Sequence, residues 1–298
     1  MTDTYETLGI NLETLSSMGQ MDYDNYDPAD LPALSPEEDK LWYSKFYYKG
    51  REELAPELAA KVAPGNSMNP ENAIIPGKNI DLLTGPGHIE SDFGYCLLPG
   101  GGGYGAGYCE LPEITMEMYK WYRDFRMASS NRLSYAIWYP GSHYSEFDGK
   151  TLEDVGLGLE HFEMAELLNS EKLGFTQKPA QVDPMYAGMI ANSSWIKNHD
   201  YPELTPRAIT LVHYIKNMKC GGIEFITHIY MGMHCINKKM VPVQNIDPKL
   251  LLELTRKMIH HCVYERANLN SFLPELYEKM KDEPFVLDKS INAFPISE

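Results

Sequence analysis

The sequence predicts an α+β fold class, and three patterns in its second half point to it. Two runs rich in β-branched and aromatic residues, Ala208 to Lys216 and Ile223 to Met231, flank the turn sequence NMKCGG and predict a β-hairpin. Glu160 to Leu168 predicts another strand, and the periodic apolar residues from Pro248 to about Asn268 predict a long helix. A curved antiparallel sheet around one long C-terminal helix is the helix-grip arrangement, as in the birch pollen allergen. It leaves a cavity between sheet and helix.

Further elements complete this prediction. Ile114 to Met127 has the spacing of an amphipathic helix, and the aromatic run from Arg132 to Tyr139 indicates a strand. Leu41 to Ala63 indicates a helix in two pieces. The glycine-rich stretch from Gly85 to Glu110 lacks the Gly-Lys-Ser/Thr ending of a phosphate loop, so we expect a hairpin or a loop over a ligand. The final helix is expected to break near Pro274 and to resume after it.

The charge balance argues against nucleic acid as the main partner. The chain has 298 residues, with 42 Asp and Glu against 26 Lys and Arg, which gives a net charge of −16. Binding to phosphates needs an excess of Lys and Arg on some face. The negative charge is concentrated in residues 1–40, where Lys40 is the only basic residue. We expect this segment to be an irregular arm that packs on a partner subunit through Tyr23, Tyr26 and Leu31.

Two regions follow from this pattern. Residues 1–84 form the acidic arm and an N-terminal helical extension, which we expect to contribute to a homodimer. Residues 85–298 form the helix-grip domain that carries the chemistry.

The chain is expected in the cytoplasm. It has no run of 18 apolar residues, which argues against a membrane span, and the start MTDTYETLGI has neither the basic nor the apolar region of a signal peptide. Its five cysteines are odd in number and never spaced as CxxC, so we expect reduced packing residues and no disulfide framework.

A histidine and a glutamate in the last predicted helix are the sharpest chemical signal. His261 and Glu265 stand four residues apart, so they share one helix face and can reach a single cation, although such a pair is also common as a surface hydrogen bond. His143 follows the turn residues Pro140 and Gly141, which can direct it into a cavity mouth or let it cap its own backbone.

The predicted strands offer further candidates. Strand alternation places Glu166 on a face with apolar neighbours, where a carboxylate needs a partner, and Glu160 is a reserve on the same face. His213 shares a face with apolar residues and is either a core histidine or a cavity residue. His228 and Tyr230, on the paired strand, can face the same space as His213.

Several segments, in this order, resemble the diacetylphloroglucinol hydrolase and phloretin hydrolase family. The resemblance covers about two thirds of the chain, and its most specific part is HxxxE followed by NLxxFLPELY. The segments are FGYCLLPGGGGYGAG (93–107), YKWYRDFRMASSNRLSYAIWYPGSH (119–143), VHYIKNMKCGGIEFITHIYMG (212–232) and HCVYERANLNSFLPELYEKM (261–280).

The resemblance implies a helix-grip fold and a zinc-dependent enzyme that hydrolyses the carbon–carbon bond between an acyl group and a phloroglucinol ring. It implies four zinc ligands, which are His143, Glu166, His261 and Glu265. It also implies that Tyr135 binds a ring hydroxyl, that His213 acts near the reacting carbonyl, and that Tyr230 is a second ring-binding tyrosine. The chain departs from the family at Ile226 and His228, where family members tend to have arginines.

Two rival functions stay open at this point. One is a helix-grip carrier that holds an aromatic polyketide or flavonoid without converting it. The other is a related hydrolase or cyclase that acts on another polyketide ketone. The four ligand positions separate enzyme from carrier, because a carrier has no reason to gather two carboxylates and two imidazoles around one point.

Overall fold

An eight-stranded antiparallel sheet is the framework of the protein. The computed structural model describes residues 27–128, 132–147, 151–154, 160–198, 207–243, 246–285 and 296. In them the strand order is β1-β2-β8-β7-β6-β5-β4-β3, and β9 and β10 form a separate hairpin. The strands are β1 (Gly94–Leu97), β2 (Gly103–Leu111), β3 (His143–Phe147), β4 (Thr151–Asp154), β5 (Glu160–Leu168), β6 (Tyr186–Asn198), β7 (Arg207–Asn217), β8 (Ile223–Met231), β9 (Met233–Ile236) and β10 (Lys239–Pro242).

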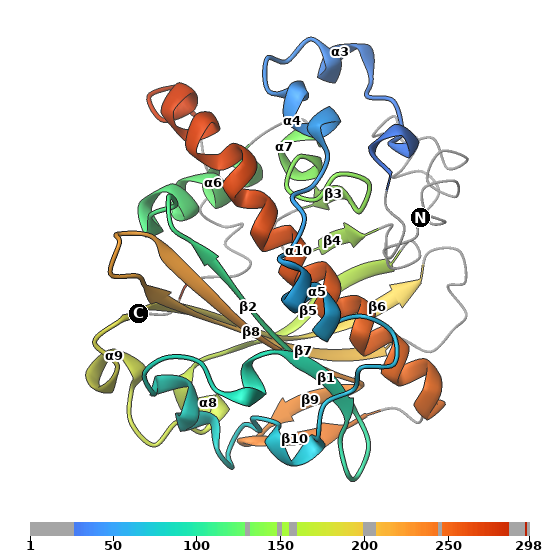
Figure 1. Ribbon diagram of the computed structural model, residues 1–298, viewed down its shortest axis with the longest axis vertical. Coiled ribbons are helices and arrows are strands. Elements are labelled where there is room, and N and C mark those ends of the chain that lie inside the picture. Colours follow the sequence, from blue (N-terminus) through green and yellow to red (C-terminus); the bar gives the residue numbers. More distant parts are fainter. Residues whose placement is uncertain are drawn as a thin grey trace.

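One long helix, α10 (Pro248–Met280), runs diagonally across the face of this sheet (Figure 1). Asp247 caps its start by accepting hydrogen bonds from the backbone N–H groups of Lys249 and Leu250. The other α-helices are α3 (Pro36–Asp39), α4 (Ser44–Lys49), α5 (Pro56–Lys61), α6 (Met116–Ala128), α7 (Leu133–Ala136), α8 (Ser170–Leu173) and α9 (Pro179–Val182), and the 3₁₀ turns are η1 (Pro28–Asp30), η2 (Pro70–Asn72), η3 (Ile80–Thr84) and η4 (Glu90–Asp92). The α+β class is therefore confirmed. None of the helices in the described part of the chain has the length and apolar character needed to cross a bilayer.

Glycines on β2 let α10 lie close to the sheet. A Cβ atom added at Gly103 would overlap the Thr255 hydroxyl, and one added at Gly107 would overlap a methyl group of Val263. At Gly105 the added atom would lie 3.1 Å from Ile259 Cβ. These alternate positions of β2 face the helix, and their glycines form the surface on which α10 packs. The glycine-rich stretch, which was predicted as a hairpin or a loop over a ligand, is therefore a hairpin.

Both faces of the sheet are covered by apolar layers. On β7 the odd-numbered residues face α10, whereas Val212 and Tyr214 face the opposite layer. That opposite layer contains Ile74, Ile80 and Leu83 from the N-terminal extension. The extension therefore packs directly on the sheet, and the boundary at residue 84 stays a prediction.

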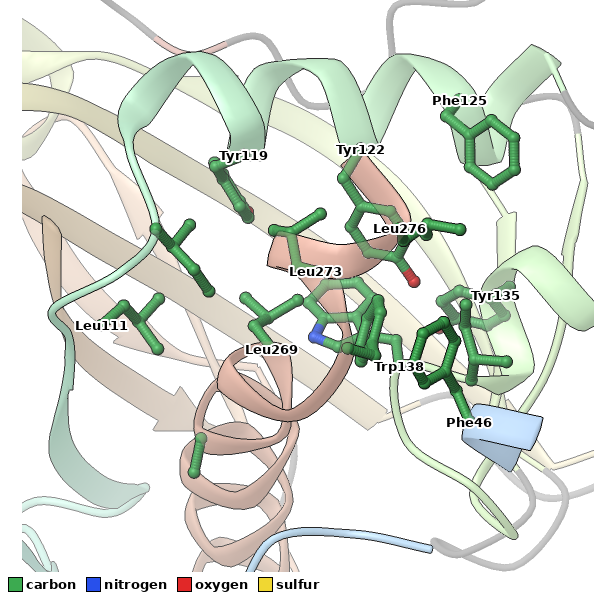
Figure 2. Close-up of a cluster of buried hydrophobic side chains, with 14 of the residues drawn as sticks. Phe46, Leu111, Tyr119, Tyr122, Phe125, Tyr135, Trp138, Leu269, Leu273 and Leu276 are labelled. Atoms are coloured by element: carbon green, nitrogen blue, oxygen red, sulfur yellow. The ribbon is translucent and has the colours of Figure 1, made fainter. Parts of the chain in front are cut away.

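The C-terminal half of α10 is held by α6. Tyr119, Tyr122 and Phe125 project from α6 into an aromatic and aliphatic cluster that also receives Leu273 and Leu276 of α10 (Figure 2). This packing fixes the helix on the side where the cavity lies.

The aromatic run predicted as a strand at Arg132 to Tyr139 is instead the short helix α7 and a turn. Its carbonyls find side-chain donors in place of a strand partner: Tyr122 donates to Ser134 O, and the Asn268 amide donates to the carbonyls of residues 137 and 138. The aromatic content therefore reflects burial and not strand formation.

The predicted break near Pro274 is also wrong, because α10 is continuous through it. Proline removes a hydrogen bond to the carbonyl of Asn270, but Asn270 is exposed, so water can replace the missing donor. Leu273 and Leu276, on either side of the proline, hold the helix by packing in the core.

The two-piece helix predicted between residues 41 and 63 is present as α4 and α5. Residues 1–26, with Tyr23 and Tyr26, lie outside the described part of the chain. Leu31, the third residue expected on a partner, packs against its own chain's core, and the Tyr47 hydroxyl donates to the nearby Pro32 carbonyl.

The close approach of α10 to β2 gives a stability prediction. Gly107→Ala should destabilise the fold by about 1–3 kcal/mol, because the new methyl group collides with Val263. Combining it with Val263→Ala should recover part of that loss, so urea denaturation of the single and double variants should give a favourable coupling free energy. Additive effects of the two substitutions would contradict the proposed contact.

Candidate active site

Three of the four predicted ligands converge at one buried point. His143 Nε2 lies 3.2 Å from His261 Nε2 and 3.1 Å from Glu265 Oε2, and His261 Nε2 lies 3.4 Å from the same oxygen. Ligand atoms held tetrahedrally at about 2.0–2.1 Å from one ion lie about 3.3–3.4 Å apart. The three atoms thus have the spacing of one face of a tetrahedral metal site, and the group can bind a metal ion.

The fold explains this convergence. His261 and Glu265 lie one turn apart on α10, on the side that faces the sheet, and all three residues are at most 6% exposed. His143 comes from the first residue of β3, directly behind the predicted turn at Pro140 and Gly141. The four-residue spacing of His261 and Glu265 therefore identified two of the three residues that could hold a metal ion.

Neighbouring side chains orient the two imidazoles. The Ser142 hydroxyl lies 3.2 Å from His261 Nδ1, so a proton on Nδ1 can be donated to Ser142 while Nε2 presents its lone pair to a cation. The Tyr135 ring stacks on the His143 imidazole, with centroids 4.1 Å apart and an angle of 5°. Tyr139 packs edge-on against His261.

Glu265 remains ionised although it is buried. Burial alone would raise its pKa, but the Arg266 guanidinium and the hydrogen bonds from His143 and His261 outweigh that effect and hold the pKa of Glu265 well below its usual range. Arg266 NH2 lies 3.2 Å from Glu265 Oε1, which leaves Oε2 directed at the imidazoles. A carboxylate and two imidazoles form a donor set suited to zinc and similar divalent ions.

A cavity opens beside this centre, between α10, α6 and the sheet. His213 and Tyr135 are on its wall, as predicted, and neither belongs to the three-residue cluster. The other lining residues are Tyr119, Arg123, Arg126, Met127, Trp138, Phe162, Ile190, Asn192, Ser194, Leu211, Met258, Cys262 and Arg266, together with the three ligands. The wall is largely aromatic and aliphatic, with arginines and a few other polar groups, which suits an aromatic ligand that carries oxygens.

His213 is neutral at physiological pH. Burial is the main cause, with a second contribution from Arg266, and together they lower the pKa of His213 to about 3. Arginine can only donate, so the contact of 3.5 Å from Arg266 NH2 makes His213 Nε2 an acceptor. His213 Nδ1 then carries the proton and donates to Thr227 Oγ1 at 2.9 Å.

Glu166 does not join the cluster of His143, His261 and Glu265. A β-bulge between Met164 and Glu166 interrupts the alternation, so Glu166 pairs with Ser193 on the strand face opposite the cavity. Its carboxylate is 2.7 Å from Lys172 Nζ, and its side chain is 47% exposed. The sequence prediction assumed an uninterrupted strand, and a bulge has no clear signal in this sequence.

His228 and Tyr230 face away from the cavity. The register places Thr227 opposite His213, so His228 and Tyr230 lie on the other face of the sheet. His228 contacts the Tyr104 hydroxyl at 2.8 Å, and the Tyr230 hydroxyl donates to the Ile74 carbonyl. Their positions contradict the prediction that they bind substrate, because the residues of β8 that share a face with His213 are odd-numbered, such as Thr227 and Ile229.

The pairing of β7 with β8 also shows that the departure from the family at Ile226 and His228 does not affect the cavity. Ile226 packs in the layer opposite α10, so the residue type there does not line the cavity. The arginines of the cavity wall come from α6 and α10 instead, and sequence reasoning missed all three: Arg123, Arg126 and Arg266. The spacing of Arg123 and Arg126 by three residues on a helix, and the place of Arg266 beside Glu265, were the available signals.

The contact between Ser142 and His261 gives a prediction for metal binding. Ser142→Ala should lower the affinity for a divalent metal by about 10- to 100-fold, because His261 loses the partner that orients it. Competition with a chromophoric chelator measures this affinity. Ser193→Ala, which removes a buried serine on the opposite face of the sheet, is the matched control and should bind metal normally. Equal loss in both variants, or none in Ser142→Ala, would exclude an orienting role.

Comparison with known proteins agrees with this geometry. The family model described as the DAPG hydrolase PhiG domain matches residues 75–154 and 148–278. A protein of Pseudomonas protegens named 2,4-diacetylphloroglucinol hydrolase is 32% identical over 273 residues, which cover 80% of this chain and 84% of that protein. A protein of the same name from a Pseudomonas species is 25% identical, with coverage of 80% and 87%. The extent of the family match and these two similarities show that the chain belongs to the DAPG hydrolase family.

Proposed function

We propose that the protein is a zinc-dependent hydrolase that cleaves the carbon–carbon bond between an acyl group and a phloroglucinol-type ring. The observation that carries this proposal is the buried cluster of His143, His261 and Glu265 at the wall of an aromatic cavity, in a chain of this family. In the reaction, water adds OH to the acyl carbon, and the ring carbon keeps the electron pair of the broken bond and takes up a proton. The products are a carboxylic acid and the deacylated ring.

Zinc fits the donor set. Nitrogen and carboxylate ligands with tetrahedral spacing are typical of zinc, and both imidazoles can present Nε2. A bound zinc ion would polarise the ketone or make a water molecule more acidic, which is the chemistry that an aryl ketone needs.

Glu160 is proposed as the fourth ligand in place of Glu166. The backbone register pairs His143 with Asp154 and Asp154 with Glu160, so these positions form one row across three strands. Positions 160 and 162 are two residues apart on β5 and therefore share one face of the strand, and Phe162 lines the cavity. Both positions precede the bulge that moves Glu166 to the opposite face.

His213 and Tyr135 are proposed to act on the substrate. A proton taken up by His213 Nε2 would lie beside Arg266 in an apolar cavity, so it would be released readily to the ring carbon. His213 is therefore suited to transferring a proton during the reaction, because its low pKa keeps it neutral before and after the transfer. Tyr135 stacks on His143 and lines the cavity, a position from which its phenol can hold the substrate ring.

The helix-grip architecture, a homodimer and a cytoplasmic location complete the proposal. The long α10 against the sheet, with the cavity between them, supports the helix-grip arrangement. All five cysteines are thiols and not disulfides, which supports a reducing compartment. A sedimentation mass equal to a single chain would contradict the dimer.

One rival differs from this proposal in its chemistry, and the other differs in its substrate. A carrier needs no ionised carboxylate beside two imidazoles, and the cluster therefore favours an enzyme. An enzyme for another polyketide ketone would use the same cluster with a different ring or acyl group.

Product analysis in H₂¹⁸O tests the proposed reaction. Zinc-loaded protein incubated with 2,4-diacetylphloroglucinol or phloretin should release the deacylated ring and a carboxylic acid that carries solvent ¹⁸O, detected by mass spectrometry. Binding of either ketone without conversion would favour the carrier. Conversion of neither, with hydrolysis of another polyketide ketone, would favour the second rival.

The choice of fourth ligand is tested by a matched pair of variants. Glu160→Gln should lower zinc affinity by at least about 10-fold and reduce turnover, because a neutral amide is a poorer zinc ligand. Glu166→Gln should leave both unchanged, since this carboxylate pairs with Lys172. Zinc affinity from chelator competition distinguishes the two, and the opposite pattern would restore Glu166 as the ligand.

The roles of His213 and Tyr135 are tested by kinetics with metal analysis. His213→Ala should lower kcat by a factor on the order of 10² to 10⁴ with zinc content unchanged. Tyr135→Phe keeps the ring that stacks on His143, so it should retain zinc but bind or convert substrate less well. Near-normal turnover in both variants would mean that other groups handle the proton and the ring.

A further inference from the structure

Arg266 is a buried cation that joins the metal centre to the cavity. Its side chain is almost completely buried, lines the cavity, and lies 3.2 Å from the carboxylate of Glu265. Its guanidinium carbon is 4.6 Å from the centre of the Trp138 ring and 5.0 Å from that of Phe225. Contacts with two aromatic rings and an ion pair fix the guanidinium in one orientation.

Only one of its three nitrogens has a partner among the described residues. NH2 contacts Glu265 and His213, whereas Nε and NH1 are buried and have no hydrogen-bond acceptor in that part of the chain. Trp138 Nε1, on the same cavity wall, is a further buried donor without an acceptor there. Leaving a buried donor without a partner costs about 1–3 kcal/mol, and more when the donor is charged. This wall therefore presents donors that a ligand rich in oxygen lone pairs would satisfy.

We propose that Arg266 binds the ring oxygen next to the acyl group of the substrate, in its anionic form. This assignment rests on the proposed function, and it names the substrate group that Arg266 recognises, which is an ionisable hydroxyl ortho to the acyl group. In aryl ketones of this kind the hydroxyl and the acyl group are attached to neighbouring ring carbons, so the ring oxygen and the carbonyl oxygen can lie close together. A carbonyl at the metal centre would therefore bring the ring oxygen close to the arginine that is paired with Glu265.

The same contact serves the bond cleavage. When the aryl–acyl bond breaks, its electron pair enters the ring and the negative charge appears on the ring oxygens. The ring carbon then takes a proton, and the acyl carbon keeps the OH of water. A guanidinium fixed before the reaction stabilises this charge without having to reorganise. Arg266 would thus be a catalytic residue, and His213, which accepts from its NH2, would also position it.

A pair of ligands that the protein need not convert tests the assignment. The probes are 2-hydroxyacetophenone and its methyl ether 2-methoxyacetophenone, which is larger by one methyl group and cannot ionise. Zinc-loaded wild-type protein should bind the hydroxy ketone about 10- to 100-fold more tightly, the range expected for a hydrogen bond to a charged group. The bound hydroxy ketone should also show the red-shifted absorption of its phenolate at a pH where the free ketone is neutral. Equal affinity for both probes in wild-type protein would overturn the proposal.

Three variants separate a binding role from a structural one. In zinc-loaded Arg266→Met, the preference should fall to about 2-fold or less and the phenolate band should disappear, whereas Arg266→Lys should keep part of both. Arg256→Met removes another buried arginine of α10, one paired with Glu253, and should keep the full preference. A phenolate band that persists in Arg266→Met with zinc bound would assign the ionisation to the metal and refute the proposal.

Chemical rescue covers the case in which the variants are unstable. Guanidinium ion added to Arg266→Ala should restore the preference, and urea, which has a similar planar shape but no charge, should not. Equal rescue by both, or rescue by neither in a folded variant, would argue against a charge-based role. If wild-type protein shows the preference through Arg266 but hydrolyses no acylphloroglucinol, the proposed function fails while this binding site stands.

Discussion

The close contact between α10 and β2 is the constraint on which the site depends. Gly103, Gly105 and Gly107 have no side chains to hold the helix away, so α10 lies directly on the sheet. At that separation, the face that carries His261 and Glu265 meets His143 from β3 at hydrogen-bond distance. The same helix is held at its other end by packing against α6 (Figure 2). It also forms one wall of the cavity beside His143, His261 and Glu265. Helix position, ligand geometry and cavity shape therefore have a common cause.

Charge compensation is the second condition for this site. A buried carboxylate is costly unless it is paired, and Glu265 is compensated on one oxygen by Arg266 and on the other by two imidazoles. Two imidazoles that face each other at 3.2 Å need a proton or a cation between them, and a divalent ion satisfies both nitrogens and the carboxylate at once. The arginine thus contributes to the electrostatics of the centre as well as to the cavity wall.

Much of the fold and part of the site could be predicted from the sequence. Hydrophobic periodicity identified the strands of the hairpin and the final helix, because this pattern is local. The four-residue spacing of His261 and Glu265, which is also local, identified two residues that could hold a metal ion. The wrong or missing site predictions arose where contacts distant in sequence determine which way a side chain points. Glu166 was misplaced by a bulge, and His228 was misplaced by the register of a hairpin, neither of which alters the local sequence pattern. Arg266 was missed because its place beside Glu265 is a weak signal, and its burial is known only from the structure.

The central claim is that the cluster of His143, His261 and Glu265 binds the ion that catalysis requires. Titration of metal-free protein with Zn²⁺, with hydrolysis of 2,4-diacetylphloroglucinol followed at each step, tests it most directly. We predict that activity rises linearly to a break at one zinc ion per chain, and that His261→Ala shows neither tight binding nor activity. Full activity in the metal-free protein, or a His261→Ala variant that binds zinc and turns over normally, would contradict the account.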